Sequence, residues 1–286
     1  MDQKPRFGLC VDPNLSWSGM VARFQRAEEL GFDSVWDCDH FQQPSRPTGP
    51  YFEGWTLLAG LAAVTKTIRL GNLVSCNTFR HPALLAKEAI TVDHISNGRL
   101  DFGLGAGWFV EEHERFGLGW PPPAELVQRF REAVEICDSM FRSELTSYQG
   151  KYYQLADAPC RPRPIQQPRP RFMLGGHRPR MLRIVAEYAD AWNSFGTTEE
   201  LRERNQILDE QCAALGRDPS TLSRSLYGWA SIMPDDPWSS VDAFHDCIGR
   251  YREAGINEFI IDYPPDHQLD VLERVAADAI PGLRQA

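Results

Sequence analysis

The stretch "IRLGNLVSCNTFRHPALLAKEAITVDHISNGRLDFGLG" (68–105) reads as a strand, a helix and a second strand in succession. Its two ends, 68–76 and 99–105, are short runs rich in apolar residues. A helix can begin at Pro82, because proline suits the first helical position, and can end at Asn97 and Gly98. A helical crossover between two strands is typical of a parallel sheet. The stretch therefore predicts one β-α-β unit of an α/β fold.

The same alternation continues along most of the chain. Strand-like runs are expected at 6–11, 32–36, 68–76, 99–105, 171–175, 190–194, 225–231 and 256–262. Helical patterns separate these runs, near 179–188, 198–214, 239–253 and 268–278 among others. The clearest, at 124–141, has apolar residues at spacings of three and four. Eight such units predict a (β/α)8 TIM barrel, with an open doubly wound sheet as the alternative. We expect a single domain over residues 1–286, with its main insertion at about 106–170, between strands four and five.

The composition is that of an ordinary globular protein, with 42% hydrophobic and 24% charged residues. A formal net charge of -9 disfavours binding to nucleic acid or to anionic membranes. No apolar run approaches the ~20 residues that span a bilayer, and the start lacks a signal-peptide core, so a cytoplasmic protein is expected. The seven cysteines are scattered without a C-x-x-C pair, which predicts reduced thiols and no metal site.

Chemically active residues follow the expected strands. Barrel enzymes place their active sites at the carboxyl ends of the strands, where the loops meet. Asp37, Asp39 and His40 end the second strand, and His40 is a candidate proton donor because its unperturbed pKa is ~6.5. The other strand ends carry Asp12, Ser75, Cys76, Asn77, Gly105, Gly107, Trp108, Gly175, Gly176, His177 and Asp262. We expect these residues to meet in one cleft.

Two glycine-rich segments suggest ligand contacts. In "FGLGAGWF" (102–109) the glycines lack the G-x-G-x-x-G spacing of a dinucleotide loop, but Gly105 and Gly107 can admit a flat ligand; close packing is the structural alternative. In "MLGGHRPRMLR" (173–183) a strand ends in glycines and a helix follows, an arrangement that can hold a phosphate. The alternative is a turn with surface arginines, although the arginines of the Pro-rich segment "APCRPRPIQQPRPR" favour the anion site.

Three stretches together resemble the bacterial luciferase-like flavin and deazaflavin oxidoreductases. They are "VWDCDHF" (35–41), "RLGNLVSCNTFRHPALLAKEAITVDHISNGRLDFGLGAGW" (69–108) and "FMLGGHRPRMLRIVAEYADAWN" (172–193). The resemblance extends from the first expected strand to the eighth. Within the family, "GAGW" followed by "EEHERFGL" (111–118) is most similar to actinobacterial members that use the deazaflavin coenzyme F420.

The resemblance implies roles for individual residues. The cofactor would be F420, or alternatively FMN, with its ring over a bulge in the third strand and a non-proline cis peptide at Ser75-Cys76. Asp39 and His40 match positions that touch the deazaflavin, with His40 as the catalytic proton donor or acceptor and Asp37 or Asp39 orienting it. The matched cofactor contacts are Asp39, Ser75, Cys76, Asn77, Gly105, Gly107, Gly175, Gly176, His177 and Arg178.

The same resemblance implies an oxidoreductase that transfers a hydride between F420 and a small organic substrate. Family members commonly form homodimers. Some sugar-phosphate dehydrogenases of the family carry a glutamate near the turn where this chain has Trp108 and Phe109. A flatter, less polar substrate is therefore expected. It would pack against an aromatic wall of Trp17, Trp108, Phe109 and Trp229. The loops 42–54 and 106–123 would select it. There are three alternative functions. The resemblance also allows an FMN-dependent monooxygenase or a non-catalytic barrel, and the histidine and acids at the strand ends, taken alone, allow a metallohydrolase.

Overall fold

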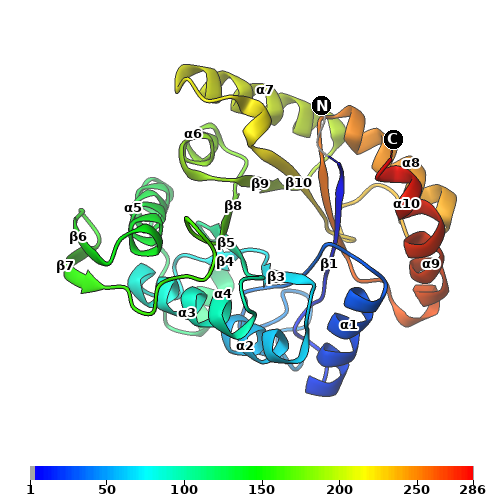
Figure 1. Cartoon of the computed structure of the whole chain (residues 1–286), viewed down its shortest axis with the longest axis horizontal. Coiled ribbons are helices and arrows are strands. Elements are labelled where there is room, and N and C mark those ends of the chain that lie inside the picture. Colours follow the sequence, from blue (N-terminus) through cyan, green and yellow to red (C-terminus); the bar gives the residue numbers. More distant parts are fainter. Residues whose placement is uncertain (1–3, 286) are drawn as a thin grey trace.

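One parallel sheet, curved into a nearly closed barrel, dominates the computed structural model, which describes residues 4–285 (Figure 1). Its strand order is β3-β2-β1-β11-β10-β9-β8-β5-β4. The strands are β1 (Arg6–Cys10), β2 (Ser34–Asp37), β3 (Arg69–Asn72), β4 (Ser75–Cys76), β5 (Asp101–Gly105), β8 (Arg171–Gly175), β9 (Ala191–Ser194), β10 (Ser223–Gly228) and β11 (Glu258–Asp262). A parallel bridge between Leu70 and Leu100 brings the two ends of the sheet together. The predicted TIM barrel is confirmed, and the open sheet is excluded.

The third predicted strand, 68–76, is in fact two strands. β3 pairs with β2, β4 pairs with β5, and the peptide bond between Leu73 and Val74 is cis. The prediction of a cis bond at Ser75-Cys76 is therefore wrong by two residues. Ser75 and Cys76 are in regular register with Leu104 and Gly105, so the chain has to change direction before them.

Helices cover the outside of the barrel (Figure 1). They are α1 (Trp17–Glu29), α2 (Gly54–Val64), α3 (Pro82–Ile95), α5 (Pro123–Arg142), α6 (Pro179–Tyr188), α7 (Thr198–Ala214), α8 (Val241–Glu253), α9 (Leu269–Arg274) and α10 (Ile280–Leu283), with short helical turns η1 (Pro219–Thr221), η2 (Asp266–Gln268) and η3 (Val275–Ala279). Their ends follow local chemistry. Thr197 and Glu200 form a capping box at the start of α7, and Asn97 and Gly98 take positive φ angles of 54° and 82° after α3. None of the helices in residues 4–285 is long and apolar enough to cross a membrane.

The segment between β5 and β8 contains two helices and a hairpin. α4 (Val110–Arg115) comes first, α5 follows, and β6 (Leu145–Gln149) and β7 (Gln154–Pro159) then pair antiparallel. Glu132 of α5 fixes the hairpin turn, because its carboxylate accepts the backbone N–H groups of Lys151, Tyr152 and Tyr153. The Pro-rich stretch 160–170 has neither helix nor strand, as its prolines predict.

Two apolar layers hold the barrel together. The larger lies between the strands and the helices, and the smaller fills the barrel interior with Cys10, Trp36, Cys38, Leu73, Met173, Ala191 and Ile260. Successive residues of a strand point to opposite faces of a sheet. Since Trp36 and Cys38 point inward, Asp37 points outward toward the helices. This alternation decides which strand-end residues can reach the mouth of the barrel.

Candidate active site

A series of aromatic ring contacts runs around the carboxyl-end mouth of the barrel. The ring of His40 lies 5.6 Å from that of Trp108, and Trp108 lies 6.1 Å from Trp229. Phe195 lies 6.1 Å from Trp229 and 5.4 Å from His177. These residues follow β2, β5, β10, β9 and β8 respectively. The predicted residues His40, Trp108 and His177 therefore border one mouth.

The carboxylate of Glu112 holds His40 in place. Its Oε2 atom is 2.8 Å from Nδ1 of His40, and its Oε1 atom accepts the backbone N–H groups of Phe41, at 2.6 Å, and Gln42, at 3.1 Å. Glu112 is fully buried in α4. A carboxylate on Nδ1 keeps the proton on that nitrogen, which leaves Nε2 as the ring atom that can exchange a proton with a ligand. Within residues 4–285 no hydrogen bond to Nε2 is formed.

The two acids before His40 act elsewhere. Asp39 accepts two hydrogen bonds from Arg80, at 2.6 and 3.0 Å, and one from the backbone N–H of Cys76, at 2.8 Å. Asp37 accepts a hydrogen bond from Asn72, and burial raises the pKa of its carboxyl well above the usual range. The prediction that Asp37 or Asp39 orients His40 is therefore wrong, because Glu112 occupies that position. In the sequence, Glu112 is only part of the stretch "EEHERFGL" (111–118), and nothing there links it to His40.

The bulge between β3 and β4 forms the floor of the mouth. Leu73 and Val74 belong to the cluster inside the barrel. A Cβ atom on Gly105 would lie 2.7 Å from Cγ2 of Val74, and one on Gly175 would lie 2.9 Å from the same atom. The missing side chains of Gly105 and Gly175 therefore make room for Val74. Gly107, with φ at +93°, packs in the same way against Cys76 and Thr78.

The residues of β4 and its loop differ in what they offer a ligand. Ser75 accepts a hydrogen bond from the indole of Trp55 at 3.1 Å, so it points outward to α2. Burial raises the pKa of the Cys76 thiol to about 12, which makes it a poor nucleophile. Asn77 is 1% exposed, and the side chain of Tyr153 lies near its amide. In residues 4–285, however, neither amide atom has a partner at hydrogen-bonding distance. An unpaired buried amide is costly and suits a polar ligand.

The edge of the mouth formed after β8 is cationic. α6 begins after Gly176 and His177 with Arg178 at its N-cap, and no side chain caps it. Burial, together with the charges of Arg204 and Arg178, lowers the pKa of His177. Uncapped backbone N–H groups and nearby cations fit a phosphate. Four arginines were expected to add to this site, but all four are engaged elsewhere. Arg161 binds Glu144, Arg163 binds the last carbonyls of α5, Arg169 binds Asp138 and Asp190, and Arg171 binds Glu258 at the other end of the barrel.

The opposite edge of the mouth is acidic. Tyr227 donates a hydrogen bond to Asp262 at 2.9 Å, and Tyr51 donates to Asp12 at 3.5 Å. Burial raises the pKa of Asp262 to about 6 and also raises that of Asp12. Neither acid has an ion-pair partner within the described part of the chain. The mouth thus has an acidic edge and a cationic edge, with His40 and the bulge between them.

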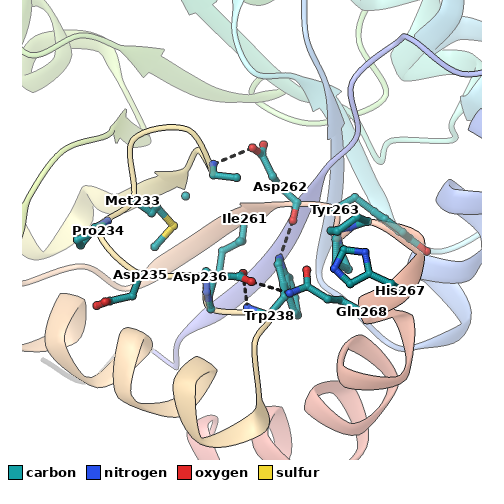
Figure 2. Close-up of a pocket in the computed structure, with 15 residues that line it drawn as sticks. Met233, Pro234, Asp235, Asp236, Trp238, Ile261, Asp262, Tyr263, His267 and Gln268 are labelled. Atoms are coloured by element: carbon teal, nitrogen blue, oxygen red, sulfur yellow. Dashed lines mark hydrogen bonds between the residues drawn. The ribbon is translucent and has the colours of Figure 1, made fainter.

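A separate rim pocket of about 450 Å³ lies beyond Asp262, between the loops after β10 and β11 (Figure 2). The carboxylate of Asp262 accepts the backbone N–H of Ala230, while its main-chain carbonyl accepts the indole N–H of Trp238 at 2.8 Å. The carboxylate also accepts a hydrogen bond from Tyr227, which does not line this rim pocket.

The predicted substrate residues are only partly together. Trp108 and Phe109 stack with ring centroids 5.1 Å apart, and Trp108 is 54% exposed at the mouth. Trp17 lies over α2 instead, where a Cβ atom on Gly60 would come within 2.9 Å of its ring. In residues 4–285, Trp17 makes no ring contact with the other predicted wall residues.

Comparisons with known proteins agree with this geometry. The family model described as luciferase-like monooxygenase matches residues 6–277. The F420-dependent glucose-6-phosphate dehydrogenase of Intrasporangium calvum is 27% identical, over 93% of this chain and 94% of that protein. The 5,10-methylenetetrahydromethanopterin reductase of Archaeoglobus fulgidus is 31% identical, over 98% of this chain and 77% of that protein. A solved F420-dependent secondary alcohol dehydrogenase, bound to an F420-acetone adduct, has a TM-score of 0.83 at 20% identity, covering 96% and 98% of the two chains.

Proposed function

This chain belongs to the luciferase-like monooxygenase family, and within it we propose an oxidoreductase that transfers a hydride between coenzyme F420 and a small organic substrate. The observation that carries the proposal is the pair His40 and Glu112 beside the Leu73-Val74 bulge. His40 follows β2, which pairs with β3 just before the bulge, so the imidazole would offer an exchangeable proton near these apolar side chains. Relatives and a structural neighbour whose names include F420 support this choice of cofactor.

The residues present fit a tricyclic cofactor with a phosphorylated tail. Val74 offers an apolar surface at the mouth, and the unpaired amide of Asn77 can bond polar atoms of a ligand. Gly176, His177 and Arg178, at the uncapped start of α6, would receive the phosphate. When bound, F420 would supply two-electron hydride chemistry that no side chain of the protein can provide.

His40 would manage the proton that accompanies the hydride. Glu112 fixes the imidazole through Nδ1, so Nε2 can give a proton to a substrate that gains a hydride, or take one in the reverse direction. Trp108 and Phe109 meet the imidazole edge-on, at 5.6 and 6.1 Å. These rings would exclude water and offer a flat, apolar wall to the substrate.

A binding and turnover experiment tests the proposal. The purified protein is titrated separately with F420 and with FMN. Hydride transfer to a panel of carbonyl, imine and alkene compounds is then followed through the absorbance of the deazaflavin at about 420 nm. We expect saturable F420 binding and turnover of at least one compound. FMN held at about 1:1 with no F420 binding would instead support a flavin monooxygenase. Binding of neither cofactor would support a non-catalytic barrel.

A matched pair of variants in α4 tests the role of Glu112. Glu112→Gln removes the charge that holds His40, so we expect kcat to fall about tenfold or more, with an altered pH profile and little change in KM. Glu111→Gln is the control, because Glu111 pairs with Arg115 on the exposed side of α4. Equal kinetics for the two variants would remove Glu112 from the mechanism.

The proposal also covers the location, oligomeric state and binding partners of the enzyme. We propose a cytoplasmic homodimer that acts on small molecules and binds neither nucleic acid nor membranes. The net charge of -9 supports the last part. Light scattering of the purified protein would give the oligomeric state, and a monomer at micromolar concentration would refute the dimer.

A further inference from the structure

Two thiols lie together inside the barrel and have no part in the proposed hydride transfer. Cys10 is the last residue of β1, and Cys38 directly follows β2. Their sulfur atoms are 3.6 Å apart, and the residues are 2% and 7% exposed. Both thiols are free, as are the other five cysteines of the described chain. No other pair of sulfurs in residues 4–285 makes such a contact.

The strands that carry the two cysteines bring their side chains together. β1 and β2 are parallel neighbours, with Cys10 opposite Trp36. Cys38 is two residues beyond Trp36, so it lies diagonally across from Cys10 and points to the same face of the sheet. A disulfide has a sulfur–sulfur distance of about 2.05 Å and Cα atoms within about 7 Å of each other, whereas diagonal neighbours lie roughly 7–8 Å apart. Closing the bond therefore requires the sulfur atoms to approach by roughly 1.5 Å and the backbone at Cys38 to move toward β1.

The position of the pair links it to the active site. Cys10 and Cys38 belong to the same interior cluster as Leu73 and Val74 of the bulge. Cys38 immediately precedes Asp39, whose carboxylate binds the backbone of Cys76, and it is two residues before His40. Any movement of Cys38 toward β1 would therefore pull on both the bulge and the imidazole.

We propose that Cys10 and Cys38 form a reversible disulfide that displaces His40 from Glu112 and lowers the rate of hydride transfer. With hydrogen peroxide as oxidant, the two thiols lose their hydrogens, one sulfur–sulfur bond forms, the oxygen–oxygen bond breaks, and two molecules of water leave. A dithiol reductant reverses the reaction by thiol–disulfide exchange. The bond itself is independent of the proposed function, whereas its effect on hydride transfer rests on it.

The environment of the thiols sets the pace of oxidation. The hydrogen bond to Cys10, together with burial, holds the pKa of the Cys38 thiol well above its usual range, and the pKa of Cys10 is also raised. Because the thiolate is the reactive form, oxidation of this pair should be slower than that of an exposed cysteine.

Peptide mapping tests the bond directly. The full-length folded protein is incubated overnight with diamide, unfolded, alkylated with N-ethylmaleimide and digested. We expect a cross-linked peptide pair containing residues 10 and 38, two hydrogens lighter than the reduced pair, with the other five cysteines alkylated. Seven alkylated cysteines, or links that involve any other cysteine, would overturn the proposal.

Variants test the effect on the site. After diamide, hydride transfer by the wild type should fall at least tenfold and return with dithiothreitol, while Cys10→Ala and Cys38→Ala should be insensitive. Cys247→Ala, in α8, is the control and should respond like the wild type. Unchanged activity of a fully cross-linked enzyme would refute the effect on His40.

Hydrogen exchange supplies a readout that needs no turnover. On oxidation, residues 36–42 should exchange faster in the wild type and remain unchanged in Cys10→Ala. If the reduced enzyme shows no F420 activity, the proposed function fails, yet peptide mapping and hydrogen exchange still decide whether the disulfide forms and moves this segment. A cross-linked protein with unaltered exchange in 36–42 would contradict the proposed movement.

Discussion

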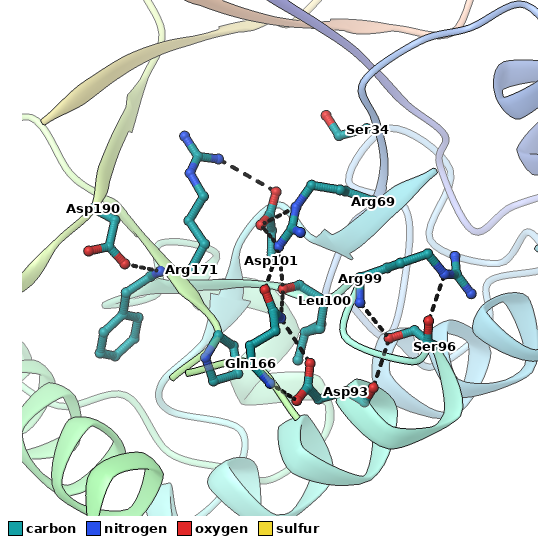
Figure 3. A network of polar contacts seen from close by, with 12 residues as sticks. Ser34, Arg69, Asp93, Ser96, Arg99, Leu100, Asp101, Gln166, Arg171 and Asp190 are labelled. Carbon is teal, nitrogen blue, oxygen red and sulfur yellow. Dashed lines mark hydrogen bonds and ion pairs between the residues drawn. The ribbon is translucent and has the colours of Figure 1, made fainter. Parts of the chain in front are cut away.

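The two ends of the barrel differ in how their buried acids are paired with cations. At the amino-terminal end of the strands, Arg69 and Arg171 bind the buried Asp101 (Figure 3). Arg171 also binds Glu258, at 2.6 Å. Arg6 completes this cluster, 3.6 Å from Asp101 and 3.7 Å from Glu258. At the carboxyl end, Asp262 and Asp12 form no ion pair with a lysine or arginine in the described chain, although Asp39 pairs with Arg80. The amide of Asn77 has no partner at hydrogen-bonding distance.

The pKa values express this difference. Burial works to raise the pKa of Asp101, but Arg171 and Arg69 outweigh it, and the pKa is lowered. Burial raises the pKa of Asp262 to about 6, because no arginine opposes it. The acids of the first end are thus paired with arginines, whereas at the second end Asp12 and Asp262 are not, and these groups are available to the proposed ligand. Substitutions at the two ends should accordingly affect different measurements.

The largest expected effect is on catalysis at the carboxyl end. His40→Asn removes the proton donor, so single-turnover hydride transfer should slow by about 10²- to 10⁴-fold while the free energy of unfolding changes little. His245→Asn, exposed on α8, is the control and should behave like the wild type. A rate within a factor of three of the wild type would show that His40 moves no proton.

At the amino-terminal end the expected effect is on stability. Glu258→Ala removes the carboxylate that pairs with the buried guanidinium of Arg171, so the free energy of unfolding should fall by about 3–5 kcal/mol. Urea denaturation measures this loss. Glu210→Ala, on the exposed face of α7, should change the same quantity by about 0.5 kcal/mol or less. Similar losses in both variants would mean that the buried charge cluster contributes no more to the free energy of unfolding than an exposed surface residue does.

A smaller effect, on cofactor affinity, should follow from a larger side chain beside the bulge between β3 and β4. Gly105→Ala places a methyl group 2.7 Å from Val74, so the bulge has to move, and F420 affinity should fall roughly tenfold, equivalent to about 1.4 kcal/mol. Adding Val74→Ala removes the clash and should restore part of the affinity. A double variant that binds no better than Gly105→Ala would separate the bulge from the cofactor site.

The smallest effect concerns pH. Asp262 has an ordinary pKa of 3.8 in the unfolded chain and about 6 in the folded protein, so between pH 4 and 6 the folded state holds more protons. The free energy of unfolding should therefore fall as pH rises through this window, by about 1–2 kcal/mol, and level off above it. Asp262→Asn should flatten the slope, whereas the exposed Asp246→Asn should retain it. Urea titrations at several pH values measure the slope; equal slopes would refute the assignment.

Much of the fold is visible in local sequence patterns. The predicted helices at 179–188 and 198–214 match α6 and α7 to the residue. Both begin with strong local signals, a proline at the first helical position of α6 and the Thr197 cap of α7. The strands were recognisable because buried parallel strands are short, continuous apolar runs.

Features that depend on distant contacts were not visible. The break between β3 and β4 follows from pairing with two different strands, and nothing in Leu73 or Val74 signals it. Glu112 binds His40 across 72 residues, so its role appears only in the fold. The roles assigned by resemblance to Asp39, Asn77 and the glycines stay predictions, although the structure gives Asp39 a firm partner in Arg80.

A crystal structure of the protein in complex with F420 is the most direct test of the carboxyl-end site. The proposed function predicts electron density for the ring system against Leu73 and Val74, within reach of Nε2 of His40. Density for the phosphate should lie at Gly176, His177 and Arg178, at the start of α6. A cofactor bound in the rim pocket of Figure 2, or with its phosphate away from α6, would contradict it.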